Sequence, residues 1–169
     1  FKAAVKNNIK RIYAPNDLVG TLKDAPDDVE IISKSADIFC EENIKTDGVL
    51  VSSPAAIYKY QDKEIYGDFR LNVFNSQTAQ HYGDLKTVTL SPELNLHEIA
   101  DLCENTNADL EVIGYGHIPL MMMKNCPIKA MGKCQKGKMI YKLEDRKREE
   151  FPIVCSKGCI AKILNSKPI

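Results

Sequence analysis

The stretch GVLVSSPAAIYKY, residues 48–60, decides the fold of this chain. Its first four residues, Gly48–Val51, form a short apolar run of the kind found in strands that are buried on both faces. Two serines end the run, and Pro54 suits the first turn of a helix that we expect to reach about Tyr60. The stretch therefore predicts one unit in which a strand is followed by a helix.

The same order recurs on both sides of this unit. Further strands are predicted at residues 11–14, 29–32, 69–74, 86–90 and 110–113. Helices are predicted at 75–82 and 95–104, while 1–8 suits a helix and 36–43 suits either a helix or an extended segment. In the helix at 95–104, one face is predicted to carry Leu96, Ile99, Ala100 and Cys103. Strands that alternate with helices predict parallel strands joined by crossover helices, an α/β fold.

Two architectures fit this alternation, an open parallel sheet and a segment of a (β/α)8 barrel. A complete barrel takes about 250 residues, so a chain of 169 residues would form an incomplete one. No G-x-G-x-x-G motif follows a predicted strand, so a dinucleotide-binding fold has no support. The chain begins at Phe1 on what reads as mid-domain sequence, and we expect it to be a fragment of a longer protein.

The composition of the sequence changes after Ile113. The following residues are rich in lysine and cysteine, with short strands predicted at 138–146 and 151–155. Leu120–Met123 is predicted to pack in an apolar core. We therefore expect residues 1–116 to be the (β/α) repeat portion of a barrel. Residues 117–169 would be a small, cysteine-containing β appendix of the same domain.

Charge is distributed unevenly, although the formal net charge is zero. Residues 1–116 have a balance of −8, and residues 117–169 have a balance of +8. This asymmetry favours an anionic partner such as RNA near the C-terminal third, with a solvated lysine surface as the alternative. No apolar run reaches 18 residues and no signal peptide is present, so we expect a cytoplasmic protein without a membrane span.

Four of the six cysteines lie close together in the sequence, namely Cys126, Cys134, Cys155 and Cys159. Thiolates are suited to zinc and to iron–sulfur clusters. The spacing Cys155-x3-Cys159 fits a zinc site, whereas Cys126-x7-Cys134 is loose for one. A [4Fe–4S] cluster also takes four thiolates and tolerates more scattered spacing. Partly buried free thiols are the remaining alternative, and Cys40 and Cys103 are predicted to be simple core residues.

Polar residues follow several predicted strands. The residues expected to gather at the carboxyl ends of the strands are Ser52, Ser53, Asn75, Ser91 and His117. Functional sites of α/β folds collect at that end. Arg70 and Glu111 lie within predicted strands, although each is equally compatible with a solvated or salt-bridged side chain. The chain contains none of the G-x-S-x-G, H-E-x-x-H or P-loop motifs, so no hydrolase mechanism is indicated by motif.

Several segments resemble one known family. They are LNVFNSQTA (71–79), TLSPELNL (89–96), LEVIGYGHIPLMMMKNCPI (110–128), LEDRKREEFPIV (143–154) and ILNSKPI (163–169). In this order they resemble the collagenase-like peptidase family, peptidase family U32, over roughly residues 48–169. The combination of EVIGYG, NCPI and L-x-D-R-x-x-x-x-F-P is specific.

The resemblance implies a TIM-type barrel and two kinds of activity. The family was named for the degradation of collagen, a protein substrate. Several members instead carry an oxygen-labile [4Fe–4S] cluster on four cysteines and serve hydroxylation of RNA bases or of a quinone precursor. The resemblance therefore implies either an iron–sulfur enzyme acting on RNA or a small anionic or aromatic substrate, or a metal-dependent protease. A non-catalytic zinc or thiol interaction module is the third hypothesis.

Residue by residue, the family motif of Glu, an aromatic or aliphatic residue and Gly is matched by Glu111, Ile113 and Gly116. The family's cysteine three residues after that glycine is replaced by Pro119, while Cys126 matches the next family cysteine. The implied metal ligands are Cys126 with Cys134, Cys155 and Cys159. We take Glu111 and His117 as candidate catalytic residues. The candidate substrate-binding residues are Arg70, Asn75 and Arg146.

Overall fold

The structure is a computed structural model that describes residues 6–22, 24–35, 43–135, 137, 139–155 and 159–169. The chain divides into two compact units, Phe1–Ile113 and Gly114–Ile169, which are described separately below. The segments predicted at 1–8 and 36–43, with Cys40, lie largely outside the described residues.

The first unit contains a six-stranded sheet in its described part. The strands are β1 (Arg11–Pro15), β2 (Glu30–Lys34), β3 (Gly48–Val51), β4 (Glu64–Gly67), β5 (Thr87–Thr89) and β6 (Leu110–Glu111). They follow one another across the sheet in sequence order, and every neighbouring pair is parallel. The helices are α2 (Pro54–Lys59), α3 (Ser76–His81) and α4 (Leu96–Glu104), with short 3-10 helices η1 (Val19–Thr21) and η2 (Phe69–Leu71). Among the described residues, no helix has the length and apolar character needed to cross a membrane.

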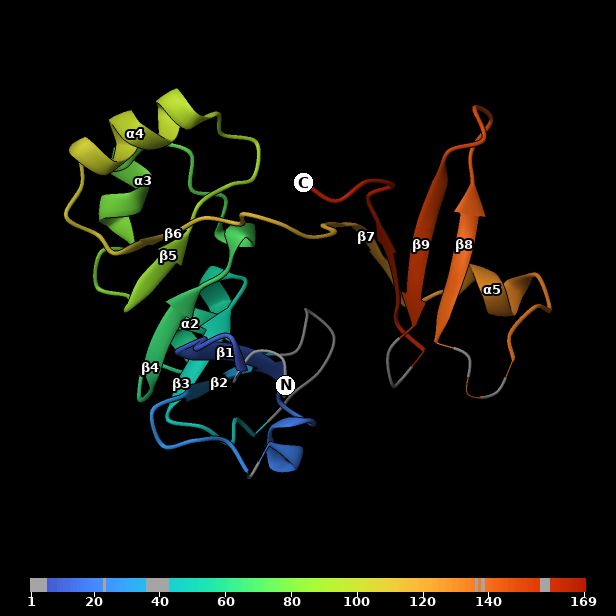
Figure 1. Cartoon of the computed structure of the whole chain (residues 1–169), viewed down its shortest axis with the longest axis horizontal. Coiled ribbons are helices and arrows are strands. Elements are labelled where there is room, and N and C mark those ends of the chain that lie inside the picture. The colour runs from blue at the N-terminus through green and yellow to red at the C-terminus, as the bar shows by residue number, and fades with distance from the viewer. Residues whose placement is uncertain (1–5, 23, 36–42, 136, 138, 156–158) are drawn as a thin grey trace. The chain divides into compact units, whose positions relative to one another are not determined.

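The sheet is curled into a half-barrel, which confirms the predicted partial TIM-like fold (Figure 1). In a flat sheet of six strands, the two edge strands would lie about 24 Å apart. Arg11 on β1 nevertheless donates a hydrogen bond from Nη1 to Oε1 of Glu111 on β6, at 2.9 Å. Side chains of the first and last strands meet only if the sheet curves around the space between them.

The two faces of the sheet have different partners because successive side chains point to opposite sides of a strand. On the outer face, Val49 and Val51 pack with the α2 residue Ile57. Farther along, Val88 of β5 packs with Leu102 of α4. The inner face has a smaller apolar cluster, formed by Ile32, Leu50 and Tyr66 with Tyr13 against it. The helices therefore cover the outside of the curve and leave the inside for polar side chains.

The prediction of a strand at residues 69–74 is wrong. The fourth strand comes earlier, at Glu64–Gly67, and residues 69–71 form η2. The carboxylate of Asp68 accepts a hydrogen bond from the backbone N–H of Arg70 and so caps η2, while Asn72 ends it in a left-handed conformation with φ 61°. The alternating apolar pattern does identify buried residues, because Leu71 and Val73 lie in the core with residues of α3 and α4. These two side chains are therefore buried by a capped turn and not by the predicted strand.

Helix α4 begins where the sequence predicts, but its buried face differs. Asn95 accepts hydrogen bonds from the first turn and Glu98 reaches back to the Asn95 backbone, which forms a capping box. Cys103 is exposed, so its predicted packing in the core is wrong, and Leu96, which is predicted on the same face, is 85% exposed. The core receives Ile99 and Leu102 instead.

The second unit is a four-stranded antiparallel sheet in its described part, and it confirms the predicted β appendix. Its strands are β7 (Pro119–Met123), β8 (Ile140–Glu144), β9 (Glu150–Cys155) and β10 (Ala161–Leu164), in the order β7-β10-β9-β8, with α5 (Pro127–Ala130) after β7. The predicted core position of Leu120–Met123 is wrong in part. Leu120 and Met121 are 59% and 53% exposed, and only Met123 packs against the core, because β7 is an edge strand.

Candidate functional site

A pocket of about 480 Å³ opens inside the half-barrel of the first unit. It is lined by Tyr13, Lys34, Leu50, Asp68, Phe69, Thr89, Glu111, Val112 and Ile113. Lys34, Thr89 and Glu111 are the last residues of β2, β5 and β6. The pocket therefore lies at the carboxyl ends of the parallel strands, where barrel enzymes place their active sites.

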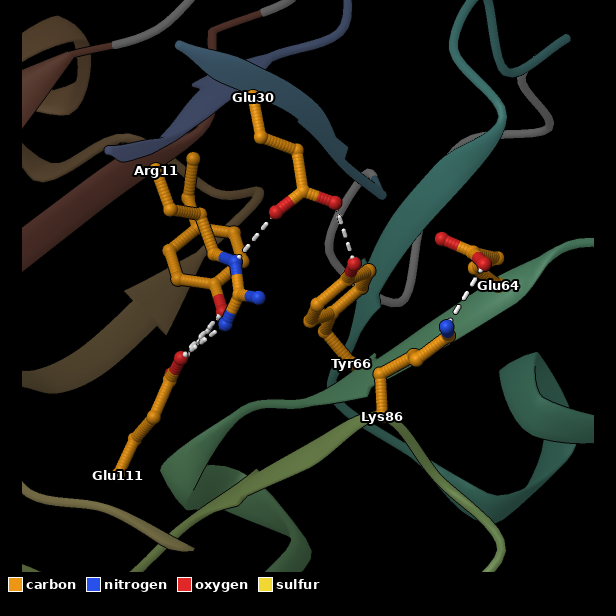
Figure 2. Close-up of polar contacts among 7 residues, drawn as sticks. Arg11, Glu30, Glu64, Tyr66, Lys86 and Glu111 are labelled. Atoms are coloured by element: carbon orange, nitrogen blue, oxygen red, sulfur yellow. Dashed lines mark hydrogen bonds and ion pairs between the residues drawn. The ribbon is translucent and has the colours of Figure 1, made fainter. Parts of the chain in front are cut away.

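Glu111 is the carboxylate of this pocket, and three other side chains hold it. Tyr13 donates its hydroxyl to Oε1 at 2.8 Å and to Oε2 at 3.0 Å. Arg11 donates to Oε1 at 2.9 Å (Figure 2). Thr89 donates weakly to Oε2 at 3.4 Å. These donors fix the carboxylate as a hydrogen-bond acceptor. Oε2 has the weaker partners of the two oxygens and so keeps the greater capacity to accept from a ligand.

Arg11, which donates to Glu111, also contacts two residues of other strands. Arg11 donates from Nε to Glu30 at 2.7 Å, and its guanidinium lies 4.7 Å from the ring centroid of Tyr66 (Figure 2). Tyr66 donates its hydroxyl to the other oxygen of Glu30 at 2.5 Å. Partial burial by itself lowers the pKa of Arg11, but the hydrogen bonds to Glu30, Tyr13 and Glu111 outweigh it and raise the pKa. Arg11 is therefore a permanent cation shared between two carboxylates.

Tyr13 remains a neutral donor over the whole physiological range. Its burial, together with the hydrogen bond and negative charge of Glu111, raises the pKa of Tyr13 to about 12. Its ring also meets that of Tyr66 edge-on, at 5.9 Å between centroids. Tyr13 thus offers a fixed hydroxyl group and an aromatic wall to the pocket.

Asp68, another residue of the pocket wall, has two cationic side chains as partners. Asp68 is only 3% exposed, and its Oδ2 lies 3.1 Å from Nζ of Lys34 and 3.0 Å from Nη2 of Arg70. The hydroxyl of Ser52 donates to the same oxygen at 3.0 Å and accepts from Arg70 at 2.7 Å. Burial alone raises the pKa of Asp68, but the charges of Lys34 and Arg70 reverse this effect and lower the pKa. Asp68 is therefore a buried, ionised carboxylate with two cationic partners.

The other rim residues predicted from the sequence have local roles. Ser53 and Asn75 accept hydrogen bonds from Ala56 and Thr78 and cap α2 and α3. Ser91 is buried and accepts weakly from the backbone of Glu93, at 3.4 Å. Of the predicted substrate-binding residues in the first unit, Arg70 does not line the pocket but pairs with Asp68, which does, whereas Asn75 acts as a helix cap.

His117 and Arg146 belong to the second unit. Nδ1 of His117 lies 2.8 Å from the backbone oxygen of Asn165, and because a carbonyl oxygen only accepts, Nδ1 is the donor of this hydrogen bond. Arg146 is exposed in the turn between β8 and β9. In this turn the carboxylate of Asp145 accepts from two backbone N–H groups, those of Lys147 and Glu149. The turn therefore presents a basic tip.

The four candidate metal ligands lie in one region of the second unit. Cys126 is buried at the start of α5, Cys155 is partly buried at the end of β9, and the two contribute to one apolar cluster. Cys134 and Cys159 are exposed. Burial raises the pKa of Cys155, and the neighbouring thiols of Cys126, Cys134 and Cys159 raise it further. Cys155 therefore interacts with all three of the other thiols.

Four thiols in one region fit a thiolate-bound metal or cluster by their chemistry. Within the part of the chain that the structure describes, no group of three or more His, Cys, Asp or Glu residues is arranged to hold a metal ion. The four cysteines therefore fit such a group by residue type, but the structure does not arrange them as a metal site.

Tyr13, Lys34 and Asp68 are site residues that the sequence did not single out. One signal was available, because the charged Arg11 and polar Tyr13 alternate with the apolar Ile12 and Ala14 in the first predicted strand. Asp68 gave no such signal, because the strand that it follows was itself missed.

Comparison with known proteins gives a family match. The model of peptidase family U32 matches residues 5–149, which includes the half-barrel pocket, Cys126 and Cys134. No curated protein and no solved structure matches the chain. The match confirms the resemblance carried by the motifs around Glu111 and Cys126. Because it extends over most of the sequence, the chain belongs to peptidase family U32.

Proposed function

We propose that this chain binds a [4Fe–4S] cluster through Cys126, Cys134, Cys155 and Cys159 and serves the hydroxylation of RNA or of a small aromatic substrate. The observation that carries the proposal is the grouping of the four thiols around Cys155, which raises the pKa of that thiol. When bound, such a cluster supplies one-electron chemistry. A cytoplasmic location, which we also propose, would keep the thiols reduced.

The half-barrel pocket supports the substrate part of the proposal. Tyr13 and Phe69 offer aromatic surface, and Lys34 beside Asp68 offers a cation. Glu111 offers a carboxylate that can accept a proton or a hydrogen bond from a hydroxyl or N–H group of the substrate. In the second unit, the basic turn that contains Arg146 favours an anionic partner.

The cluster is tested by anaerobic reconstitution of the full chain with iron and sulfide. We expect the protein to bind iron and sulfide and to show visible absorption. Cys126→Ala should abolish both, because it removes a buried thiol that interacts with Cys155. Cys103→Ala is the matched control, since Cys103 is exposed on α4 in the first unit, and this variant should retain full iron content.

The same preparation separates the alternatives. A Cys126→Ala protein with full iron content contradicts the proposal. Stoichiometric zinc without colour would indicate a zinc-bearing interaction module. Peptide cleavage that is lost on chelation but survives removal of iron would indicate a metal-dependent collagenase-like protease, the activity for which the family is named.

A further inference from the structure

Thr89 and Glu111 lie side by side in the wall of the half-barrel pocket. They are the last residues of β5 and β6, and the register of these neighbouring strands pairs them directly. Residues that are paired in this way point to the same face of a sheet. Both residues line the pocket. The hydroxyl of Thr89 and the carboxylate of Glu111 therefore reach the pocket from adjacent positions.

The contact between these two side chains is weak. Oγ1 of Thr89 lies 3.4 Å from Oε2 of Glu111, whereas a good hydrogen bond between two oxygens spans about 2.5–3.0 Å. The hydroxyl of Tyr13 has one proton and lies closer to Oε1, at 2.8 Å, than to Oε2, at 3.0 Å. Arg11 also donates to Oε1. Oε2 of Glu111 can therefore accept a stronger hydrogen bond than the one that Thr89 gives it.

A hydroxyl group of a ligand satisfies both side chains at once. It donates its proton to Oε2 of Glu111, and its lone pair accepts the proton of the Thr89 hydroxyl. An ether oxygen can only accept, and an N–H group whose nitrogen lone pair is delocalised can only donate. Of these three groups, only the hydroxyl replaces one weak contact with two hydrogen bonds.

The rest of the pocket wall suits an apolar ligand with a ring. Tyr13 and Phe69 supply aromatic surface, while Leu50, Val112 and Ile113 supply aliphatic surface. The volume of about 480 Å³ lies within the range of about 300–1,000 Å³ that is typical of small-molecule sites. Apolar walls with a small number of polar groups are also typical of such sites, and the polar groups fix the orientation of the ligand.

We propose that the pocket binds a small aromatic molecule through a hydroxyl group held between Thr89 and Glu111. Glu111 accepts from this hydroxyl group, Thr89 donates to it, and Tyr13 positions Glu111. This inference rests on the proposed function in treating the half-barrel pocket as the substrate site, and it narrows the substrate class to aromatic compounds with a free hydroxyl group.

The test compares the binding of three probes to the purified full chain by NMR titration at neutral pH. The first, 4-methylphenol, donates and accepts; 4-methylaniline donates but accepts poorly, and 4-methylanisole only accepts. We expect 4-methylphenol to bind the wild-type chain about tenfold more tightly than 4-methylanisole, the effect of one hydrogen bond to a charged group. Glu111→Gln should reduce this advantage, because its side chain is a neutral acceptor. Thr89→Val keeps the shape of the side chain without its hydroxyl, and it should reduce the advantage of 4-methylphenol over 4-methylaniline.

Two further variants keep the result interpretable. Thr89→Ser retains the hydroxyl and should retain the preference for 4-methylphenol. Glu64→Gln removes a carboxylate that pairs with Lys86 at 2.9 Å outside the pocket, and it should bind all three probes as the wild type does (Figure 2). The inference is overturned if the wild-type chain shows no saturable binding of 4-methylphenol, if it binds either of the other probes as tightly, or if Thr89→Val leaves the preference unchanged. Because the assay needs neither iron nor turnover, its failure is distinct from failure to bind a cluster.

Discussion

Asp68 is the residue that connects the polar side chains around it at the pocket wall. It follows β4 directly, is 3% exposed, and accepts from Ser52 as well as pairing with Lys34 and Arg70. A buried carboxylate is tolerable only when such partners compensate for the loss of water. Removal of its charge takes away the carboxylate that Lys34 and Arg70 share.

Asp68→Asn should therefore destabilise the first unit by about 3 kcal/mol at neutral pH. The pKa of Asp68 is lowered in the folded chain, so its contribution is complete above the pKa of the unfolded carboxyl group, about 3.9, and is lost as the pH falls below that value. Urea unfolding at several pH values should show a difference between wild type and variant that is constant near neutrality and shrinks in acid.

The control for this experiment is Asp28→Asn. Asp28 also pairs with a lysine, Lys10, but both side chains are more than 60% exposed. Its replacement should have a much smaller effect, because solvent screens exposed pairs. Equal losses for Asp68→Asn and Asp28→Asn would contradict the structural importance of the buried carboxylate.

At the scale of elements, capping residues decide where the chain is helical. Asn95 opens α4 with a complete capping box, and Asp68 converts an alternating sequence into the short helix η2. Polar side chains that satisfy the free N–H groups at a helix start often set that start more firmly than helix propensity does. The apolar pattern after such a cap then determines only which side chains are buried.

Asn95→Ala should destabilise the first unit by about 1 kcal/mol, because two backbone N–H groups lose their acceptor. Thermal unfolding followed by circular dichroism measures the change. Asn107→Ala, at an exposed loop position shortly after the same helix, should leave the midpoint almost unchanged. A similar fall in both variants would show that the capping box is not the cause.

At the scale of the whole half-barrel, Arg11 is the residue that connects the first strand with the last. Its guanidinium contacts Glu111 on β6, Glu30 on β2 and the ring of Tyr66 on β4 (Figure 2). Backbone hydrogen bonds join only neighbouring strands, so they do not by themselves bring β1 toward β6. The side chains on the inner face supply that contact.

Arg11→Met should lower the free energy of unfolding by about 1–2 kcal/mol, since the lost hydrogen bonds are charged but one-third exposed. The adjacent variant Lys10→Met removes only the exposed pair with Asp28 and should change it little. A double-mutant cycle between Arg11→Met and Glu111→Gln isolates the contact across the barrel. If the two effects add without coupling, this contact does not stabilise the curl.

The sequence by itself determined the alternation of strands and helices, the start of α4 at Asn95, the β character of the last third and the family. These features depend on local spacing, on caps and on motifs, all of which can be read along the chain. The predicted strand at 69–74 failed because one side-chain cap at Asp68 overrode an alternating pattern. The predicted burial of Cys103 failed because helical spacing alone does not say which face meets the sheet.

Only the tertiary structure decided the composition of the site. Arg11 and Tyr13 are about 100 positions from Glu111, and Lys34 is 34 positions from Asp68, yet they are in contact. Curvature of the sheet brings them together, because it turns the inner faces of distant strands toward one another. No local pattern encodes that pairing. The sequence therefore pointed to Glu111 and Arg70 separately, whereas the fold shows that Glu111 lines a pocket whose wall also includes Asp68, the partner of Arg70.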